Sequence, residues 1–136
     1  MLYSYTLETP AENLCPITAQ VQGAVADSGI TDGICVVYCP HTTAGITINE
    51  NADPDVRTDM TKIHDRLIKE NEPYYDHVLE GADDMPAHAK CSLTGVSLNI
   101  PISKGKLNLG TWQGIYLCEF RDHGGRRKLT ATIIGE

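Results

Sequence analysis

The sequence predicts an α+β fold, a single compact domain in which a mostly antiparallel or mixed β-sheet is covered by two main helices. Two patterns support this prediction: short segments such as 96–102 alternate apolar and polar residues, whereas the longer segment 54–70 repeats apolar residues at helical spacing. The third observation is size, because 136 residues with 41% hydrophobic content suffice for one core and argue against a second domain. One domain spanning residues 1–136 is therefore expected.

The first third of the chain is predicted to run strand, helix, strand. Residues 2–9 alternate weakly and predict the first strand. From residue 13 the apolar residues recur at helical spacing until Gly29, which is placed as a C-terminal stop. Residues 33–39 form a continuous apolar run, which is typical of a strand buried on both faces. That strand would deliver His41 to its end.

The remainder is predicted to contain a second helix, a functional loop and three strands. Asp53 followed by proline predicts a helix start, and the polar stretch 71–90 lacks any apolar period apart from a short helix expected at Pro86. Strands are expected over three further segments, namely 96–102, 115–120 and 129–134. The residues between the last two, 121–126, are interpreted as a hairpin connection.

Charge and composition exclude several classes of function. The formal net charge of −7 argues against general binding to nucleic acid or to an anionic membrane, because both partners require a basic field. No apolar run approaches the roughly 20 residues that span a bilayer, and the N-terminus lacks a basic region followed by an apolar one. The five cysteines form no CxxC pair, which fits reduced packing thiols. A cytoplasmic location is predicted.

The segment 41–54 carries more polar chemistry than a structural strand needs. His41 and Glu50 lie near the two ends of a short apolar alternation, and Glu50 is flanked by two asparagines, of which Asn49 is a candidate substrate contact. Glu50 is interpreted as a general base, a metal ligand or a partner for a histidine. Asp53 is either a helix cap or part of the same catalytic group as His41 and Glu50.

Three histidines are candidate metal ligands. His41, His88 and His123 each occur in a polar segment flanked by glycine or proline, and three histidines are a standard ligand set for a divalent ion such as zinc. The adjacent pair Asp83 and Asp84 could help to bind Mg²⁺ or could simply be solvated. The two remaining histidines, His64 and His77, are assigned to the surface or to partial packing.

The basic residues of the C-terminal half suggest an anionic ligand. Lys90 and Arg121 are candidate phosphate contacts, and hydroxyl or amide groups could add donors. These additional candidates are Ser92, Thr94, Asn49 and Gln113. The run 126–128 is interpreted either as a phosphate site or as the guard of an exposed strand edge. Trp112 is assigned to the core or to a subunit interface.

Several long motifs resemble one family. The segments HTTAGITINENADPDV, EGADDMPAHAK with the following SLTG, and LGTWQGIYLCEFRDH resemble the YjbQ-like family, whose members are called secondary thiamine-phosphate synthases. The resemblance covers nearly the whole chain. It implies a compact α+β fold, a homotrimer and a polar site associated with metal binding. It also implies an activity, the condensation of a pyrimidine pyrophosphate with a thiazole phosphate.

Two hypotheses of function follow. In the first, the protein is a metal-dependent enzyme that acts on a small phosphorylated molecule, with zinc or magnesium held by the histidines and Arg121 and Lys90 neutralising the phosphate. In the second, it is a non-catalytic trimeric module that senses a metal or a phosphorylated metabolite.

Overall fold

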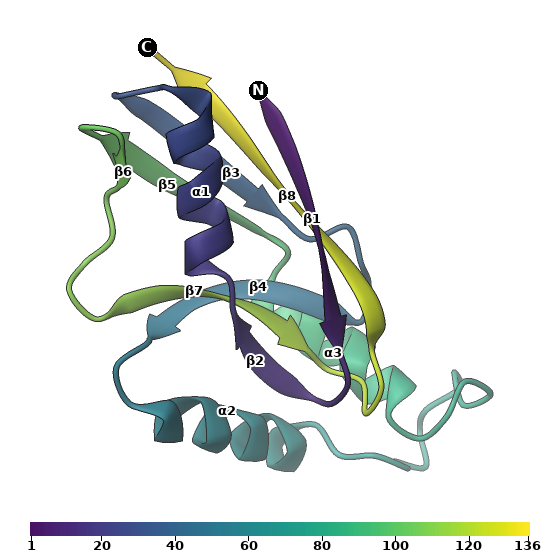
Figure 1. Cartoon of the computed structure of the whole chain (residues 1–136). Helices are drawn as coiled ribbons and strands as arrows, with labels where there is room; N and C mark the ends of the chain where they lie inside the picture. Colours follow the sequence, from purple (N-terminus) through teal and green to yellow (C-terminus); the bar gives the residue numbers. More distant parts are fainter.

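The structure is a computed structural model that describes residues 1–136 and contains three helices and eight strands (Figure 1). The helices are α1 (Thr18–Ser28), α2 (Pro54–Leu67) and α3 (Asp84–Thr94). The strands are β1 (Leu2–Thr9), β2 (Asn13–Pro16), β3 (Gly33–Tyr38), β4 (Ala44–Glu50), β5 (Ser97–Ser103), β6 (Lys106–Leu107), β7 (Gln113–Glu119) and β8 (Gly125–Gly135). The predicted α+β class is confirmed: α1 and α2 correspond to the two main helices that were expected, and α3 contains the short helix expected at Pro86.

The strands form two antiparallel sheets. A five-stranded sheet has the order β1-β8-β3-β5-β6, and a three-stranded sheet has the order β2-β7-β4. Figure 1 shows α1 lying across the five-stranded sheet, α2 below the smaller sheet and α3 behind it. The main core of 17 buried residues joins α1 to the inner faces of both sheets, and burial of that apolar surface is the main stabilising contribution. A second cluster of six buried residues includes side chains of α3 and β7.

Local signals place α1 and α2 as the sequence predicts. The carboxylate of Asp53 accepts a hydrogen bond from the Asp55 amide at 2.9 Å, and Pro54 follows as the first helical residue. Directly after the last residue of α1, Gly29 adopts the left-handed conformation with φ of 70°, which suits a residue without a Cβ. The segment 13–16, however, is the short strand β2 rather than the start of a helix, because it pairs with β7.

Strand β3 was predicted to be buried on both faces, and this is wrong. Cys35 and Val37 point into the core, whereas Ile34 and Tyr38 are 38% and 46% exposed on the opposite face. The sequence run is continuously apolar because β3 has apolar residues on its buried face and also an apolar residue, Ile34, on its exposed face. Sequence composition does not distinguish this arrangement from full burial.

Helix α2 buries none of its residues, although its apolar residues recur on one side. Ile63 and Leu67 are 53% and 69% exposed, and the helix ends at Leu67, before the end of the predicted helical segment 54–70. Helix α3 is longer than expected: it begins at Asp84, places Pro86 in its first turn, and continues through Thr94.

The segment 121–126 does not form a hairpin. Strand β7 belongs to the three-stranded sheet and β8 to the five-stranded sheet, so the connection carries the chain from one sheet to the other. The basic run 126–128 pairs with β1 on one side, but β3 pairs with β8 only as far as Thr130, so on its other side this run extends past the end of β3. Trp112 is 63% exposed, which excludes it from the core of this chain.

The five cysteines are unpaired thiols, four of them buried and Cys15 half-buried. Burial raises the pKa of Cys35 and Cys39 to about 11, so both remain protonated and pack as small apolar groups. None of the helices combines the length and apolar character that crossing a bilayer requires.

Candidate functional site

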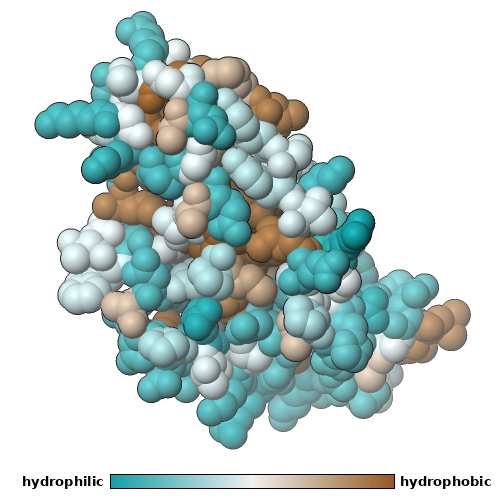
Figure 2. Space-filling view, in the orientation of Figure 1, coloured by the Kyte–Doolittle hydropathy of each residue, from teal (hydrophilic) through white to brown (hydrophobic).

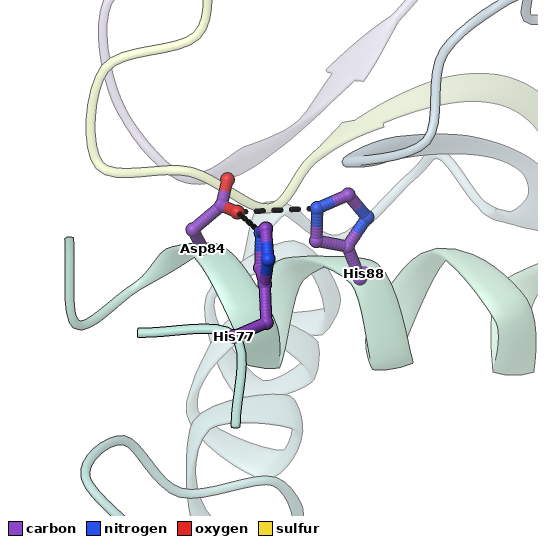
Figure 3. A group of neighbouring side chains, drawn as sticks. All are labelled: His77, Asp84 and His88. Atoms are coloured by element: carbon purple, nitrogen blue, oxygen red, sulfur yellow. Dashed lines mark hydrogen bonds and ion pairs between the residues drawn. The ribbon is translucent and has the colours of Figure 1, made fainter. Parts of the chain in front are cut away.

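Two histidine side chains converge on one carboxylate oxygen of Asp84 at the start of α3 (Figure 3). Nε2 of His77 lies 2.7 Å from Oδ2 of Asp84, and Nε2 of His88 lies 3.1 Å from the same oxygen. One ligand atom from each residue can be chosen so that all three atoms lie within 4.8 Å of one another. We call His77, Asp84 and His88 the His-Asp-His cluster.

Helix geometry and one loop assemble this cluster. Asp84 and His88 are four residues apart on α3 and therefore share a face, while His77 comes from the loop between α2 and α3. Figure 3 shows the His77 ring approaching Asp84 from that loop and the His88 ring approaching from the next turn of the helix. The Asp84 side chain is 6% exposed, but the side chains of His77 and His88 are 50% and 31% exposed. The cluster therefore consists of a buried carboxylate and two imidazole rings that reach the surface.

Arg121 fixes the carboxylates behind the cluster. Its Nη1 lies 3.0 Å from Oδ1 of Asp84, and its Nε and Nη2 donate to the Asp83 carboxylate at 3.1 and 3.3 Å. Nη2 also donates to the Glu80 carbonyl at 2.9 Å. These hydrogen bonds from Arg121, with one from the Asp122 amide, outweigh burial and lower the pKa of Asp83 below its ordinary value. Arg121 therefore occupies one oxygen of Asp84 and leaves the other, Oδ2, to the histidines.

The donor set fits a divalent transition metal. Two imidazole nitrogens and one carboxylate oxygen are ligands that zinc accepts, and three protein ligands leave a position for water or substrate. A carboxylate held by an arginine is also the kind of outer-sphere support that metal ligands usually receive. The carboxylate now shared by the two rings is the group that an ion between them would use.

Two hollows flank α3 and reach the cluster. The first, about 670 Å³, lies between the segment that follows β3 and one side of α3; His41 and His88 both line it, and we call it the β3 hollow. The second, about 1030 Å³, lies between α3 and the segment after α2; His77, Tyr74 and Tyr75 line it, and we call it the tyrosine hollow. The histidines of the cluster thus face different spaces.

The three histidines predicted as metal ligands are not gathered. Only His88 belongs to the cluster, while Nε2 of His41 accepts a hydrogen bond from the Lys128 amide at 2.8 Å. His123 is exposed, with its Nδ1 3.0 Å from the Pro10 carbonyl. His77, which the sequence assigned to the surface or to partial packing, is the second histidine of the cluster. The spacing of Asp84 and His88 was the available signal, since a carboxylate and a histidine four apart share a helix face.

The predicted phosphate-binding cations are both engaged with carboxylates. Lys90 is 4% exposed, and its Nζ donates to Glu12 at 2.9 Å and to Asp65 at 2.6 Å. Together these three residues tie α3 to α2 and to the segment before β2. Arg121 is held by Asp83 and Asp84, as described above. Neither cation is free to neutralise a phosphate.

The remaining candidates from the segment 41–54 lie away from the cluster. Strand β4 begins beside α3 and ends at Glu50 near the start of α2 (Figure 1). The Glu50 carbonyl accepts from the Tyr116 hydroxyl at 2.8 Å, and the side chain of Asn49 accepts from the Glu50 amide. Asp53 caps α2. These contacts account for Asn49 and Asp53 as local structure and place Glu50 at the opposite end of β4 from His41.

Three hydroxyl or amide candidates have different surroundings. The Gln113 side chain accepts from the Gly110 amide at 2.7 Å and so closes the turn before β7. Thr94 is the last residue of α3, and its methyl group would be 3.3 Å from a Cβ placed at Gly45. Ser92 lines both hollows, which makes it the predicted hydroxyl nearest to the candidate ligand space.

A second charged cluster, which sequence reasoning missed, lies fully inside the protein. Glu119 is 0% exposed and accepts from Arg127 through Nε at 2.7 Å and through Nη2 at 2.6 Å. The Thr9 hydroxyl donates to Glu119 at 2.6 Å, and Arg127 Nη2 also donates to Thr43. Burial alone would raise the pKa of Glu119, but the hydrogen bonds from Arg127 and Thr9 outweigh it and lower the pKa. We call these four residues the buried Glu-Arg cluster.

The chain and its α+β fold are similar to those of known proteins. The family described as UPF0047 protein YjbQ-like matches residues 3–136. The chain is 47% identical to UPF0047 protein MJ1081 of Methanocaldococcus jannaschii, covering 100% of this chain and 96% of that one. It is 42% identical to UPF0047 protein YjbQ of Escherichia coli O157:H7, covering 96% and 95% of the two chains.

Solved structures agree. A crystal structure of an uncharacterized conserved protein of the YjbQ/UPF0047 family from Clostridium acetobutylicum matches with a TM-score of 0.90 at 50% identity, covering 97% of this chain and 99% of that one. Hypothetical protein APE1520 from Aeropyrum pernix matches with a TM-score of 0.92 at 32% identity, covering 100% and 99%. The chain therefore belongs to the UPF0047 (YjbQ-like) family. These names specify no reaction or ligand.

Proposed function

We propose that the protein is a metal-dependent enzyme in which His77, Asp84 and His88 bind one divalent ion, and that it acts on a small phosphorylated metabolite. The convergence of two imidazole nitrogens on one carboxylate oxygen carries this proposal. A purely structural ion network would be expected to bury its histidines, whereas these two reach the surface at 50% and 31% exposure. The tyrosine hollow reaches His77 and the β3 hollow reaches His88, so a ligand can approach the cluster from either side of α3.

Zinc is the ion that the donor set favours. Imidazole nitrogen suits zinc, whereas magnesium prefers oxygen ligands and retains most of its water. A bound ion of this kind supplies Lewis-acid stabilisation to an oxygen of the ligand. The protein's own contribution is positional: Arg121 fixes Asp84, and Asp84 in turn sets the positions of His77 and His88.

The resemblance described above suggests a specific reaction for this site, the joining of a pyrimidine pyrophosphate to a thiazole phosphate. Because Lys90 and Arg121 are both held by carboxylates, the positive charge for a departing pyrophosphate would come mainly from the ion. The alternative is a non-catalytic module that binds a metal or a phosphorylated metabolite. The two differ in turnover, not in metal binding.

Turnover that depends on zinc tests the enzyme. We would assay the pyrimidine pyrophosphate and thiazole phosphate pair, and a panel of small phosphorylated metabolites, with chelator-treated protein before and after zinc is restored. The account expects turnover only with zinc, loss of turnover in His88→Ala and retention in the matched variant His123→Ala, whose ring lies outside the cluster. Turnover that survives both chelation and His88→Ala would contradict the metal-dependent proposal. Zinc binding without any turnover would favour the binding module.

A homotrimer is proposed as the assembly, on the basis of the family resemblance and of an uncovered sheet face. The outer face of the five-stranded sheet exposes Ile34 and Ile134, which are direct cross-strand partners, together with Leu2 and Tyr38. Exposed apolar side chains gathered on one face are typical of an interface. Sedimentation equilibrium should give about 44 kDa, since one chain has 14.8 kDa. Ile134→Glu should shift that mass toward the monomer, and a monomeric wild type would contradict the proposal.

A further inference from the structure

His41 holds an unusual position at the end of β3. Strand β3 pairs with β8 as far as Tyr38, which lies opposite Thr130, so the amide of Lys128 has no partner on β3. The His41 ring satisfies that amide through Nε2 at 2.8 Å. The main chain of His41 is also held, because its carbonyl accepts from Sγ of Cys91 at 3.7 Å. The ring is therefore held by β8, and the main chain of His41 is held by α3.

This hydrogen bond determines which ring nitrogen carries the proton. A backbone N–H can only donate, so Nε2 of His41 must be the acceptor and cannot itself be protonated. The ring is then neutral, with its proton on Nδ1. Burial, followed by the charge of Arg127, lowers the pKa of His41, which agrees with a neutral ring. His41 is thus a hydrogen-bond donor without a free lone pair.

His41 lines the β3 hollow, where a ligand could accept a hydrogen bond from its ring. His41 and His88 both line this hollow, whereas His77 and Asp84 do not, so a ligand of an ion held by the cluster would enter the hollow on the His88 side. The hollow has hydroxyl groups from Tyr38, Thr42 and Ser92, but none of its lining residues is a lysine, an arginine or a carboxylate. A negatively charged ligand in this hollow would be surrounded by neutral hydrogen-bond donors, and only the ion would balance its charge. An oxyanion oxygen fits both conditions.

We propose that His41 donates its Nδ1–H to a phosphate oxygen of the ligand bound at the His-Asp-His cluster, with the phosphate lying in the β3 hollow. This inference rests on the proposed function, since the ion provides the charge that the hollow lacks. It assigns to His41 a ligand-binding role and not that of a metal ligand or of a base acting through Nε2. It also replaces Lys90 and Arg121 as the groups that recognise phosphate.

The first test uses wild-type protein and long-range ¹H–¹⁵N correlation spectra of labelled histidine. In metal-free protein at neutral pH, the His41 ring should show a protonated Nδ1 and an unprotonated Nε2. After zinc is added and inorganic phosphate is titrated, the Nδ1–H resonance should shift. A protonated Nε2, or a doubly protonated ring, would overturn the inference, and so would an Nδ1–H resonance that phosphate leaves in place.

The second test compares variants by calorimetry with zinc and then with inorganic phosphate. His41→Ala should bind zinc within about twofold of wild type but lose roughly 10- to 100-fold in phosphate affinity, the range of a hydrogen bond to a charged group. His123→Ala should match wild type in both. Phosphate affinity within threefold of wild type in His41→Ala would overturn the inference alone. A wild type that binds no zinc would overturn the proposed function and this inference together, and the spectra of metal-free protein would then still report the tautomer.

Discussion

The two charged clusters of this protein each pair an arginine with carboxylate, yet they differ in what they leave open. In the buried Glu-Arg cluster, Glu119 accepts from Arg127, Thr9 and the Arg121 amide, and its side chain is 0% exposed. In the His-Asp-His cluster, Arg121 takes one oxygen of Asp84, and the second oxygen meets two partly exposed imidazoles. The first cluster is closed and the second is open.

This difference separates a structural role from a functional one. The closed cluster joins the ends of β1, β7 and β8 and has no space for a ligand; even a Cβ at Gly124 would collide with the Glu119 carboxylate. The open cluster combines the same kind of ion pair with ring nitrogens that can turn from the carboxylate to an ion. We therefore expect substitutions in the closed cluster to change stability, and those in the open cluster to change metal affinity.

The largest expected effect is Arg127→Met. It leaves the carboxylate of Glu119 buried without its main partner, which typically costs about 3–5 kcal/mol of unfolding free energy. Urea denaturation monitored by circular dichroism measures this cost. A loss below about 1 kcal/mol would show that the closed cluster is not a structural element.

The second-largest effect is expected for Arg121→Ala, in which calorimetry measures the affinity of the His-Asp-His cluster for zinc. Loss of the contact that fixes Oδ1 of Asp84 should weaken zinc binding by about 10- to 100-fold, the range seen when outer-sphere partners of metal ligands are removed. Because Arg121 is 28% exposed, the unfolding free energy should fall by less than in Arg127→Met. If Arg121→Ala changed stability but not zinc affinity, the contrast between the clusters would fail.

A smaller effect should appear in the pH dependence of unfolding. The folded pKa of Glu119 lies below its ordinary value of 4.5, so its contribution to stability is present above about pH 4.5 and is lost as pH falls through the folded value. Unfolding free energies of wild type and Glu119→Gln should therefore converge as the pH is lowered below 4.5. A difference in unfolding free energy between the two proteins that stays constant with pH would contradict the lowered pKa of Glu119.

The smallest effect is expected for Arg126→Met, the matched control for Arg127→Met. Arg126 is 80% exposed, and its only ion pair, with Glu8, is long at 3.8 Å. Exposed pairs of this kind contribute little, so the unfolding free energy should change by less than about 0.5 kcal/mol. A change as large as that of Arg127→Met would mean that the loss is not specific to the buried arginine.

Elements with local causes could be predicted from the sequence. The cap at Asp53, the stop at Gly29 and the strand 2–9 depend on neighbouring residues, and the structure confirms all three. The membership of strands in sheets depends on distant pairing, so the connection 121–126 was misread as a hairpin.

In the candidate site, too, the residues with local causes could be predicted from the sequence, and those that depend on distant contacts could not. His88 was identified, and its spacing from Asp84 is local to α3. His77 was not identified, because it lies in a loop without apolar period, and only the course of that loop brings its ring to α3. Lys90 and Arg121 were assigned to phosphate because the carboxylates that hold them are distant in sequence or on another element. Figure 2 shows a hydrophobic patch at the far right of the molecule, where Figure 1 shows the loop between α2 and α3 projecting. Two apolar residues of this loop, Val78 and Leu79, are 59% and 95% exposed.

The most direct test of the open cluster is X-ray absorption spectroscopy at the zinc edge of protein loaded with one equivalent of zinc. Two imidazole nitrogens with oxygen ligands are expected, and His77→Ala and His88→Ala should each lose one imidazole contribution. A zinc environment without histidine, or one that both variants leave unchanged, would contradict the assignment of this cluster as the metal centre.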